Sequence, residues 1–253
     1  MNLPPLQSGE VLAAEDGAVL TLTLNRPDKL NALTGAMYRD LVDLLAFAGD
    51  SDDVRAVLIL GAGKSFSAGN DLADFLAAGE GTEGGAAPVC RAVGRFEMPL
   101  VIGVQGHAVG VGTTMLLHAD LVVAADDAKF LTPFVDLGAV PEAGSAKLLP
   151  AWLGYQRAAR MLLAGEPLLA PEALQAGLVA KMVSPAELAD TAADYARTLA
   201  AKPPRAMRES KRLMRQAAQM DLHDLIDHDL ALFAELLQGD EAKAILAAKV
   251  GKK

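Results

Sequence analysis

Cysteine, positive charge and uninterrupted apolar runs are all scarce in this sequence. One cysteine, Cys90, in 253 residues excludes an intramolecular disulfide framework and a metal site built from several thiolates. The formal net charge of −9 argues against nucleic-acid binding, which requires a basic patch. Residues 98–119 carry no formal charge, but glycines, Gln105 and two histidines interrupt them, which indicates a buried strand, turn and helix. The first five residues hold neither a basic nor an apolar stretch. We therefore expect no signal peptide, no membrane contact and a cytoplasmic location.

Several common active-site signatures are also missing. Gly63-Lys64-Ser65 lacks the glycine that a phosphate-binding loop needs five positions earlier, where Leu58 stands. Neither glycine-rich turn carries three glycines at the dinucleotide-binding spacing, and no Gly-x-Ser-x-Gly elbow presents a hydrolase nucleophile. The four histidines have no metal-ligand spacing, so we expect no metal site. His107 lies inside a glycine turn, where it serves either packing or catalysis.

Strand and helix signals alternate through the first part of the chain. Asp16-Gly17 predicts a hairpin between apolar runs at 11–12 and 19–24, and Thr34 predicts a helix N-cap. The remaining elements expected here are strands at 54–60, 100–104, 121–125 and 129–131, helices at 72–78 and 110–117, and a mobile glycine-rich loop at 79–87. This order predicts an α/β fold with mainly parallel strands.

The pattern becomes helical after Ser145. We expect helices at 145–152, 156–164, 171–176, 185–200, 204–218, 222–237 and 241–249. Lys202-Pro203-Pro204 marks a hinge, so the chain divides into a core at 1–200 and a helical segment at 201–253. Such a segment packs either on a neighbouring subunit or over its own core.

Two glycine-rich turns are the most informative feature of the sequence. The turns lie at 61–71 and at 106–112, and each follows an apolar strand and precedes a predicted helix. Glycine lets the backbone turn sharply, and a helix start leaves N–H groups without partners. Two such turns brought together present donors for one developing negative oxygen, which is the arrangement of an oxyanion hole.

Glu142 is the strongest candidate for an acid–base group. It is the only glutamate between Met98 and Gly165, and apolar residues precede it just before a predicted helix. A glutamate there stabilises the helix dipole, by about 0.3–1 kcal/mol, or acts as a base. Asp136 is a weaker candidate, and Asp71 is expected to cap the helix that begins at Leu72.

Taken together, these segments resemble the crotonase, or enoyl-CoA hydratase/isomerase, superfamily over nearly the whole chain. The markers are Leu-Asn-Arg-Pro at 24–27, Leu-Asn-Ala-Leu at 30–33, Phe-Ser-Ala-Gly-Asn-Asp at 66–71, Gly-His-Ala-Val-Gly-Val-Gly at 106–112, Ala-Asp-Leu at 119–121, Leu-Gly at 137–138 and Gln-Ala-Gly-Leu-Val at 175–179. The resemblance implies a spiral of ββα turns with a C-terminal helical trimerisation region. It also implies an acyl-CoA thioester substrate, no cofactor beyond that coenzyme A, and a homotrimer or a hexamer.

The resemblance also assigns site residues. It implies that the backbone N–H groups of Ala68 and Val111 hold the thioester oxygen. It implies substrate-binding positions at Arg26, Lys29, Leu30, Ala68, Gly69, Asn70, Asp71, Leu72, Gly110, Thr114 and Phe134.

Two departures from the family pattern affect the expected reaction. Hydratases of this family use two glutamates, and the corresponding positions here are Thr114 and Phe134. Neither side chain acts as a general base near neutral pH. What remains is Glu142, whose surroundings resemble those of peroxisomal-type Δ3,Δ2-enoyl-CoA isomerases, where this glutamate is the single base. We therefore expect a double-bond shift from 3-enoyl-CoA to 2-enoyl-CoA. The alternatives are a hydratase or another crotonase-type reaction, and a non-catalytic acyl-CoA-binding subunit.

Overall fold

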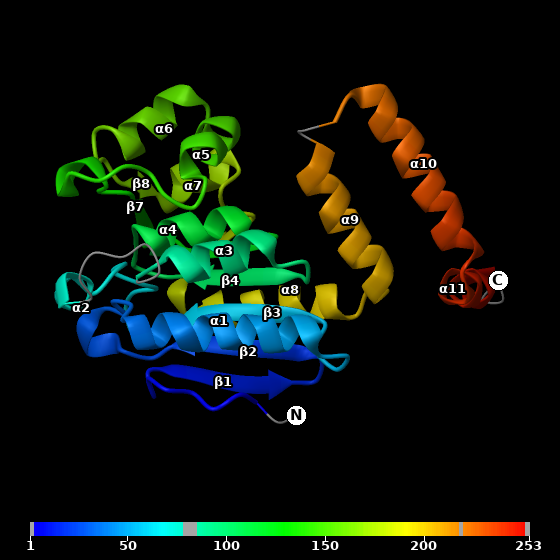
Figure 1. Cartoon of the computed structure of the whole chain (residues 1–253), viewed down its shortest axis with the longest axis horizontal. Helices are drawn as coiled ribbons and strands as arrows, with labels where there is room; N and C mark the ends of the chain where they lie inside the picture. The colour runs from blue at the N-terminus through cyan, green and yellow to red at the C-terminus, as the bar shows by residue number, and fades with distance from the viewer. Residues whose placement is uncertain (1–2, 78–84, 218–219, 251–253) are drawn as a thin grey trace. The chain divides into compact units, whose positions relative to one another are not determined.

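The chain divides into two compact units in the computed structural model. They comprise residues 1–200 and 201–253, and residues 3–77, 85–217 and 220–250 are described (Figure 1). In these ranges no helix has the length and apolarity needed to cross a membrane.

The first unit is built on two sheets. The larger, six-stranded sheet has the order β1 (Val11–Asp16), β2 (Val19–Leu24), β3 (Ala56–Gly61), β4 (Leu100–Val104), β6 (Leu121–Ala125) and β9 (Lys181–Val183). The smaller sheet has the order β5 (His107–Val109), β7 (Lys129–Leu131) and β8 (Leu168–Leu169). Strands β2, β3, β4, β6 and β9 pair in parallel, whereas β1 and β2 form an antiparallel hairpin at Asp16-Gly17. The predicted α/β fold with mainly parallel strands is confirmed.

Helices cover both faces of the larger sheet. Those of the first unit are α1 (Gly35–Asp50), α2 (Leu72–Ala77), α3 (Ala87–Arg95), α4 (Val111–Thr114), α5 (Ser145–Leu153), α6 (Tyr155–Leu162), α7 (Ala170–Ala176) and α8 (Leu188–Ala200). Side chains alternate between the faces of a strand. Thus Leu20 and Leu22 of β2 join a core with α1 and α3, whereas Val19 belongs to a second apolar cluster with α8. Thr34 caps α1 as predicted, because its hydroxyl accepts a hydrogen bond from the Met37 N–H at 3.3 Å.

Several short elements differ from the sequence predictions. Helix α3 begins at Ala87, the last residue of the loop predicted at 79–87, and residues 79–84 of that loop lie outside the described residues. The helix expected at 110–117 is split into α4 and a 3-10 turn, Met115–His118. Strands β8 and β9 interrupt the region that was predicted to be helical. Each is two or three residues long, which is too short for an alternating pattern to reveal.

The second unit consists of helices. They are α9 (Pro204–Gln216), α10 (Leu222–Gln238) and α11 (Asp240–Val250). An ion pair joins Arg205 of α9 to Glu235 of α10, and the two helices line one apolar hollow. Leu222, Leu230 and Phe233 of α10 are 65%, 61% and 62% exposed, so this unit presents an unusual amount of apolar surface.

Candidate active site

The two glycine-rich turns pack directly against each other. Ser67 donates its N–H to the His107 carbonyl at 3.0 Å and accepts from the Val109 N–H at 2.9 Å. A Cβ at Gly69 would lie 2.7 Å from the Val109 carbonyl oxygen, and one at Gly112 would lie 3.1 Å from the Ser67 Cβ. Gly69 also has a φ of +85°. Gly69 is therefore required by both packing and backbone conformation, and at Gly112 the close contact with Ser67 favours glycine.

The structure corrects the choice of donor on the first turn. Ala68 was expected to offer its N–H to a ligand, but this N–H donates to the Leu30 carbonyl at 2.8 Å. The Gly69 carbonyl accepts from the Leu33 N–H at 2.7 Å. In a planar trans peptide the next N–H points the opposite way, so the Asn70 N–H faces away from Leu33. Among the described residues none accepts a hydrogen bond from it. Asn70, not Ala68, carries the available donor of this turn.

The second turn carries the N–H of Val111, the donor that the family resemblance implies. Val111 is the first residue of α4, so its N–H has no acceptor inside the helix. The preceding carbonyl, of Gly110, accepts from Thr113 and Thr114, each at 2.9 Å, which directs the Val111 N–H to the other side of that peptide. Within the described part of the chain no residue accepts from this N–H. Because Gly69 packs on Val109 and Gly110, the two donors belong to neighbouring backbone segments.

Glu142 contacts the short helix α4, which begins at the second donor. Its Oε1 accepts from the Thr114 hydroxyl at 3.0 Å, and its Oε2 accepts from the Cys90 thiol at 3.6 Å. Thr114 ends the helix that Val111 begins, about 4.5 Å along the axis at the usual rise of about 1.5 Å per residue. Burial raises the pKa of the Glu142 carboxyl, and the hydrogen bonds from Thr114 and Cys90 oppose that rise. A half-buried carboxylate with a raised pKa is suited to taking up and returning a proton.

The backbone around Glu142 is held in an uncommon conformation. Ala143 has a φ of +49°, which is unfavourable for a residue with a Cβ. The His118 Nε2 contacts the Ala143 carbonyl oxygen at 2.9 Å. The Ser145 hydroxyl donates to the Glu142 carbonyl at 2.6 Å. These contacts fix the direction in which the Glu142 side chain leaves the backbone.

Two side chains of this cluster were not anticipated as site residues. Tyr38, from α1, is 2% exposed, and its hydroxyl donates to the Asn70 Oδ1. Burial raises its pKa well above the usual value, and the charge of Glu142 adds to the effect. Burial, followed by the charge of Glu142, likewise raises the pKa of the Cys90 thiol to about 12. Tyr38 and Cys90 are therefore neutral neighbours of the carboxylate. The available signal for Tyr38 was a hydroxyl on the mainly apolar buried face of α1.

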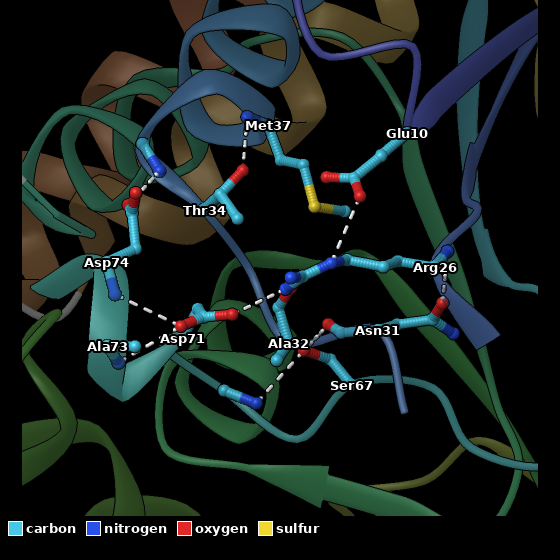
Figure 2. A network of polar contacts seen from close by, with 12 residues as sticks. Glu10, Arg26, Asn31, Ala32, Thr34, Met37, Ser67, Asp71, Ala73 and Asp74 are labelled. Atoms are coloured by element: carbon cyan, nitrogen blue, oxygen red, sulfur yellow. Dashed lines mark hydrogen bonds and ion pairs between the residues drawn. The ribbon is translucent and has the colours of Figure 1, made fainter. Parts of the chain in front are cut away.

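Arg26 and Asp71 form part of the scaffold of the site. Figure 2 shows the Arg26 guanidinium between Asp71, at 2.6 Å, and Glu10, at 3.0 Å. The other carboxylate oxygen of Asp71 accepts from the N–H groups of Ala73 and Asp74, which confirms its expected role as a cap of α2. Arg26 holds the pKa of Asp71 below its usual value. With two carboxylates beside it, this arginine is already engaged by the protein's own anions.

The other predicted positions fall into different environments. Lys29 and Leu72 are exposed at the surface, whereas Phe134 is 9% exposed and belongs to the core. The side chain of His107 is exposed, and the side-chain partners of Glu142 are Thr114 and Cys90 rather than His107 or Asp136. No group of three or more potential metal ligands occurs among the residues described.

The fold and this site define a protein of the crotonase class. A solved structure from Magnetospirillum magneticum AMB-1 superposes with a TM-score of 0.94 at 41% sequence identity, covering 98% of both chains. The family model described as enoyl-CoA hydratase/isomerase matches residues 14–251, and the chain belongs to this family.

Curated relatives carry names of more than one reaction. Enoyl-CoA delta isomerase 2 of Rattus norvegicus is 39% identical over 224 residues, which are 86% of this chain and 57% of the relative. The chain thus spans little more than half of that protein. The 2,3-dehydroadipyl-CoA hydratase of Escherichia coli K12 is 33% identical over 253 residues, 96% of each chain. The relatives therefore agree on the family but not on one reaction, and the reaction has to be inferred from the residues of the site.

Proposed function

We propose that the protein is an enoyl-CoA isomerase that converts a 3-enoyl-CoA into the conjugated 2-enoyl-CoA. The observation that carries this proposal is the setting of Glu142: one carboxylate with a raised pKa, hydrogen-bonded to Thr114 of the short helix that begins at the Val111 donor. Threonine and phenylalanine occupy the two positions, Thr114 and Phe134, where a hydratase of the resembled family carries glutamates. A double-bond shift needs one base, whereas the two-acid route to water addition needs two.

The proposed reaction uses the two N–H donors to stabilise negative charge. The thioester oxygen accepts hydrogen bonds from Asn70 and Val111, which bind a developing enolate more strongly than the neutral carbonyl. Glu142 removes a proton from C2, and the electron pair of that bond passes into a dienolate. The protonated Glu142 then returns the proton at C4, and the double bond forms between C2 and C3. Removing one such donor typically costs about 10²–10³ in rate.

Substrate binding is proposed along the loop that precedes α1. Leu30 has a φ of +51°, and its carbonyl holds the Ala68 N–H, so this loop lies against the oxyanion turn. Lys29 is exposed next to it and is suited to meet the phosphates of coenzyme A. Coenzyme A belongs to the substrate, and the proposed reaction needs no further cofactor.

The test is the set of products that purified protein forms from a 3-enoyl-CoA and, in a parallel reaction, from the 2-enoyl-CoA of the same chain length, followed by NMR and mass spectrometry. Isomerisation moves the vinylic protons to C2 and C3 and leaves the mass unchanged. Hydration adds the mass of one water, and its detection as the main reaction would favour the hydratase that relatives such as the Escherichia coli protein exemplify. Tight binding without any turnover would instead indicate an acyl-CoA-binding subunit.

We also propose that the second unit mediates assembly into a homotrimer or a dimer of trimers. The support is its exposed apolar surface, to which Leu222, Leu230 and Phe233 contribute. Large exposed apolar patches are typical of subunit contacts. Light scattering on the purified protein should give three or six times the 26.3-kDa chain mass, and a monomer at micromolar concentration would contradict the assignment.

A further inference from the structure

Asn70 is held from two directions by one short segment of the chain. On the backbone side, Leu33 donates to the Gly69 carbonyl at 2.7 Å and accepts from the Asp71 N–H at 2.9 Å. On the side-chain side, the Tyr38 hydroxyl donates to the Asn70 Oδ1. Leu33 and Tyr38 flank the start of α1, so the beginning of this helix determines how Asn70 is oriented.

Tyr38 is itself rigidly placed. It lies in the first turns of α1, where its N–H donates to the Thr34 carbonyl at 3.0 Å, and its side chain is 2% exposed. Its raised pKa means that the phenol stays protonated at neutral and moderately alkaline pH, so it remains a donor. The charge of Glu142 contributes to this rise in pKa. The hydrogen bond from Tyr38 joins this buried, neutral phenol to the residue that carries the available N–H.

The packing core of α1 does not require this hydroxyl. Met37, Leu41 and Leu44 supply apolar side chains to the same buried face, and phenylalanine would fill the volume of the Tyr38 ring. A buried hydroxyl is costly unless it is hydrogen-bonded, and here its partner is the residue that carries the available N–H. The hydroxyl therefore has a role that packing alone does not explain.

We propose that Tyr38 is a positioning residue for oxyanion binding: through the Asn70 side chain it holds the Asn70 N–H in the direction of the thioester oxygen. This inference rests on the part of the proposed function in which that N–H receives the oxygen. It does not depend on which reaction follows, because every reaction through a thioester enolate uses the same oxygen.

The test compares Tyr38→Phe with the matched control Tyr155→Phe, whose tyrosine is 69% exposed on α6. We expect Tyr38→Phe to lower kcat roughly 3- to 10-fold, the usual range for losing one hydrogen bond, with little change in KM. The control should match wild type. Thermal melting of both variants reports whether either substitution disturbs the fold.

Two further measurements separate positioning from a merely structural role. A bound, conjugated dienoyl-CoA absorbs at longer wavelength when donors polarise its carbonyl, and Tyr38→Phe should reduce that red shift without any turnover. In the background of Asn70→Ala, Tyr38→Phe should have little further effect, because the group through which it acts has gone. An unchanged red shift, or losses that multiply fully in the double variant, would overturn the inference. A red shift that depends on Tyr38 in a protein that hydrates but does not isomerise would overturn the proposed function alone.

Discussion

Replacement of Glu142 by glutamine tests the proposed chemistry with a nearly isosteric change. Glutamine keeps an oxygen that accepts from Thr114 or Cys90, but it cannot take up a proton from carbon at neutral pH. A positioned general base typically contributes 10²–10⁴ in rate. We therefore expect Glu142→Gln to lower kcat for isomerisation by at least about 100-fold. Binding of the acyl-CoA should change little, because the donors of Asn70 and Val111 remain in place.

The same substitution is expected to leave the fold as stable as before, or more stable. The pKa of Glu142 is raised by burial, so folding favours the protonated form. The associated stability is fully present below the unfolded-state pKa and is lost as the pH rises through the folded-state pKa. At pH 8 the wild-type protein has lost this contribution, whereas the neutral glutamine has no charge to bury. Thermal melting of Glu142→Gln at pH 8 should occur at or above the wild-type temperature.

The assay follows formation of 2-enoyl-CoA from 3-enoyl-CoA by stopped-flow absorbance, with both proteins at saturating substrate. Glu97→Gln, an exposed glutamate after α3, is the matched control and should behave as wild type. Activity of Glu142→Gln within a few fold of wild type would refute the assignment of the base. A loss of activity accompanied by a lower melting temperature would refute the account of how burial acts on this carboxylate.

Three further predictions concern the surroundings of the site. The rate should rise with pH as Glu142 deprotonates, with a midpoint above the usual glutamate range. Thr114→Val should move that midpoint higher, because it removes a hydrogen bond that lowers the pKa of Glu142. A pH–rate profile that does not move would contradict this. With a pKa of about 12, only a fraction on the order of 10⁻⁴ of Cys90 is thiolate at pH 8. Iodoacetamide should therefore label Cys90 far more slowly than it labels a small free thiol. Rapid stoichiometric labelling would contradict the buried setting of this thiol. Arg26→Gln should lower the free energy of unfolding by about 1 kcal/mol in urea titrations at pH 7. The pKa of Asp71 is lowered in the fold, so the stability from this ion pair is lost as the pH falls and Asp71 protonates, and the effect of Arg26→Gln should shrink in acid. An effect that stays constant down to acid pH would argue against this ion pair.

The sequence predicted which segments form the site more reliably than it predicted which backbone N–H groups and side chains act there. Glycine at 69 and 112 was visible as a turn signal, and the structure gives the reason, a close approach between the two backbones. The sequence did not reveal which N–H of the first turn is available. That depends on Leu30 and Leu33, which engage the N–H of Ala68 and the carbonyl of Gly69 from a segment more than thirty residues away. Such pairing has no local pattern.

The missed side chains have a similar explanation. Tyr38 fits the helical apolar spacing of α1, so its hydroxyl was hidden among core positions. Cys90 lies on α3, which was not predicted because Pro88 and Gly94 weaken its helical signal, although proline is well tolerated at a helix start. Only the tertiary fold brings both residues to Glu142, which itself stood out because it is a lone carboxylate in an apolar stretch.

The most direct test of the central claim is the ratio of two kcat/KM values measured on one preparation of wild-type protein. One is for isomerisation of a 3-enoyl-CoA, and the other is for hydration of the 2-enoyl-CoA of the same chain length. A single base at Glu142, with Thr114 and Phe134 in place of acids, predicts that isomerisation is faster by at least about two orders of magnitude, the lower bound of a missing general acid–base group. Hydration as fast as isomerisation would contradict the account.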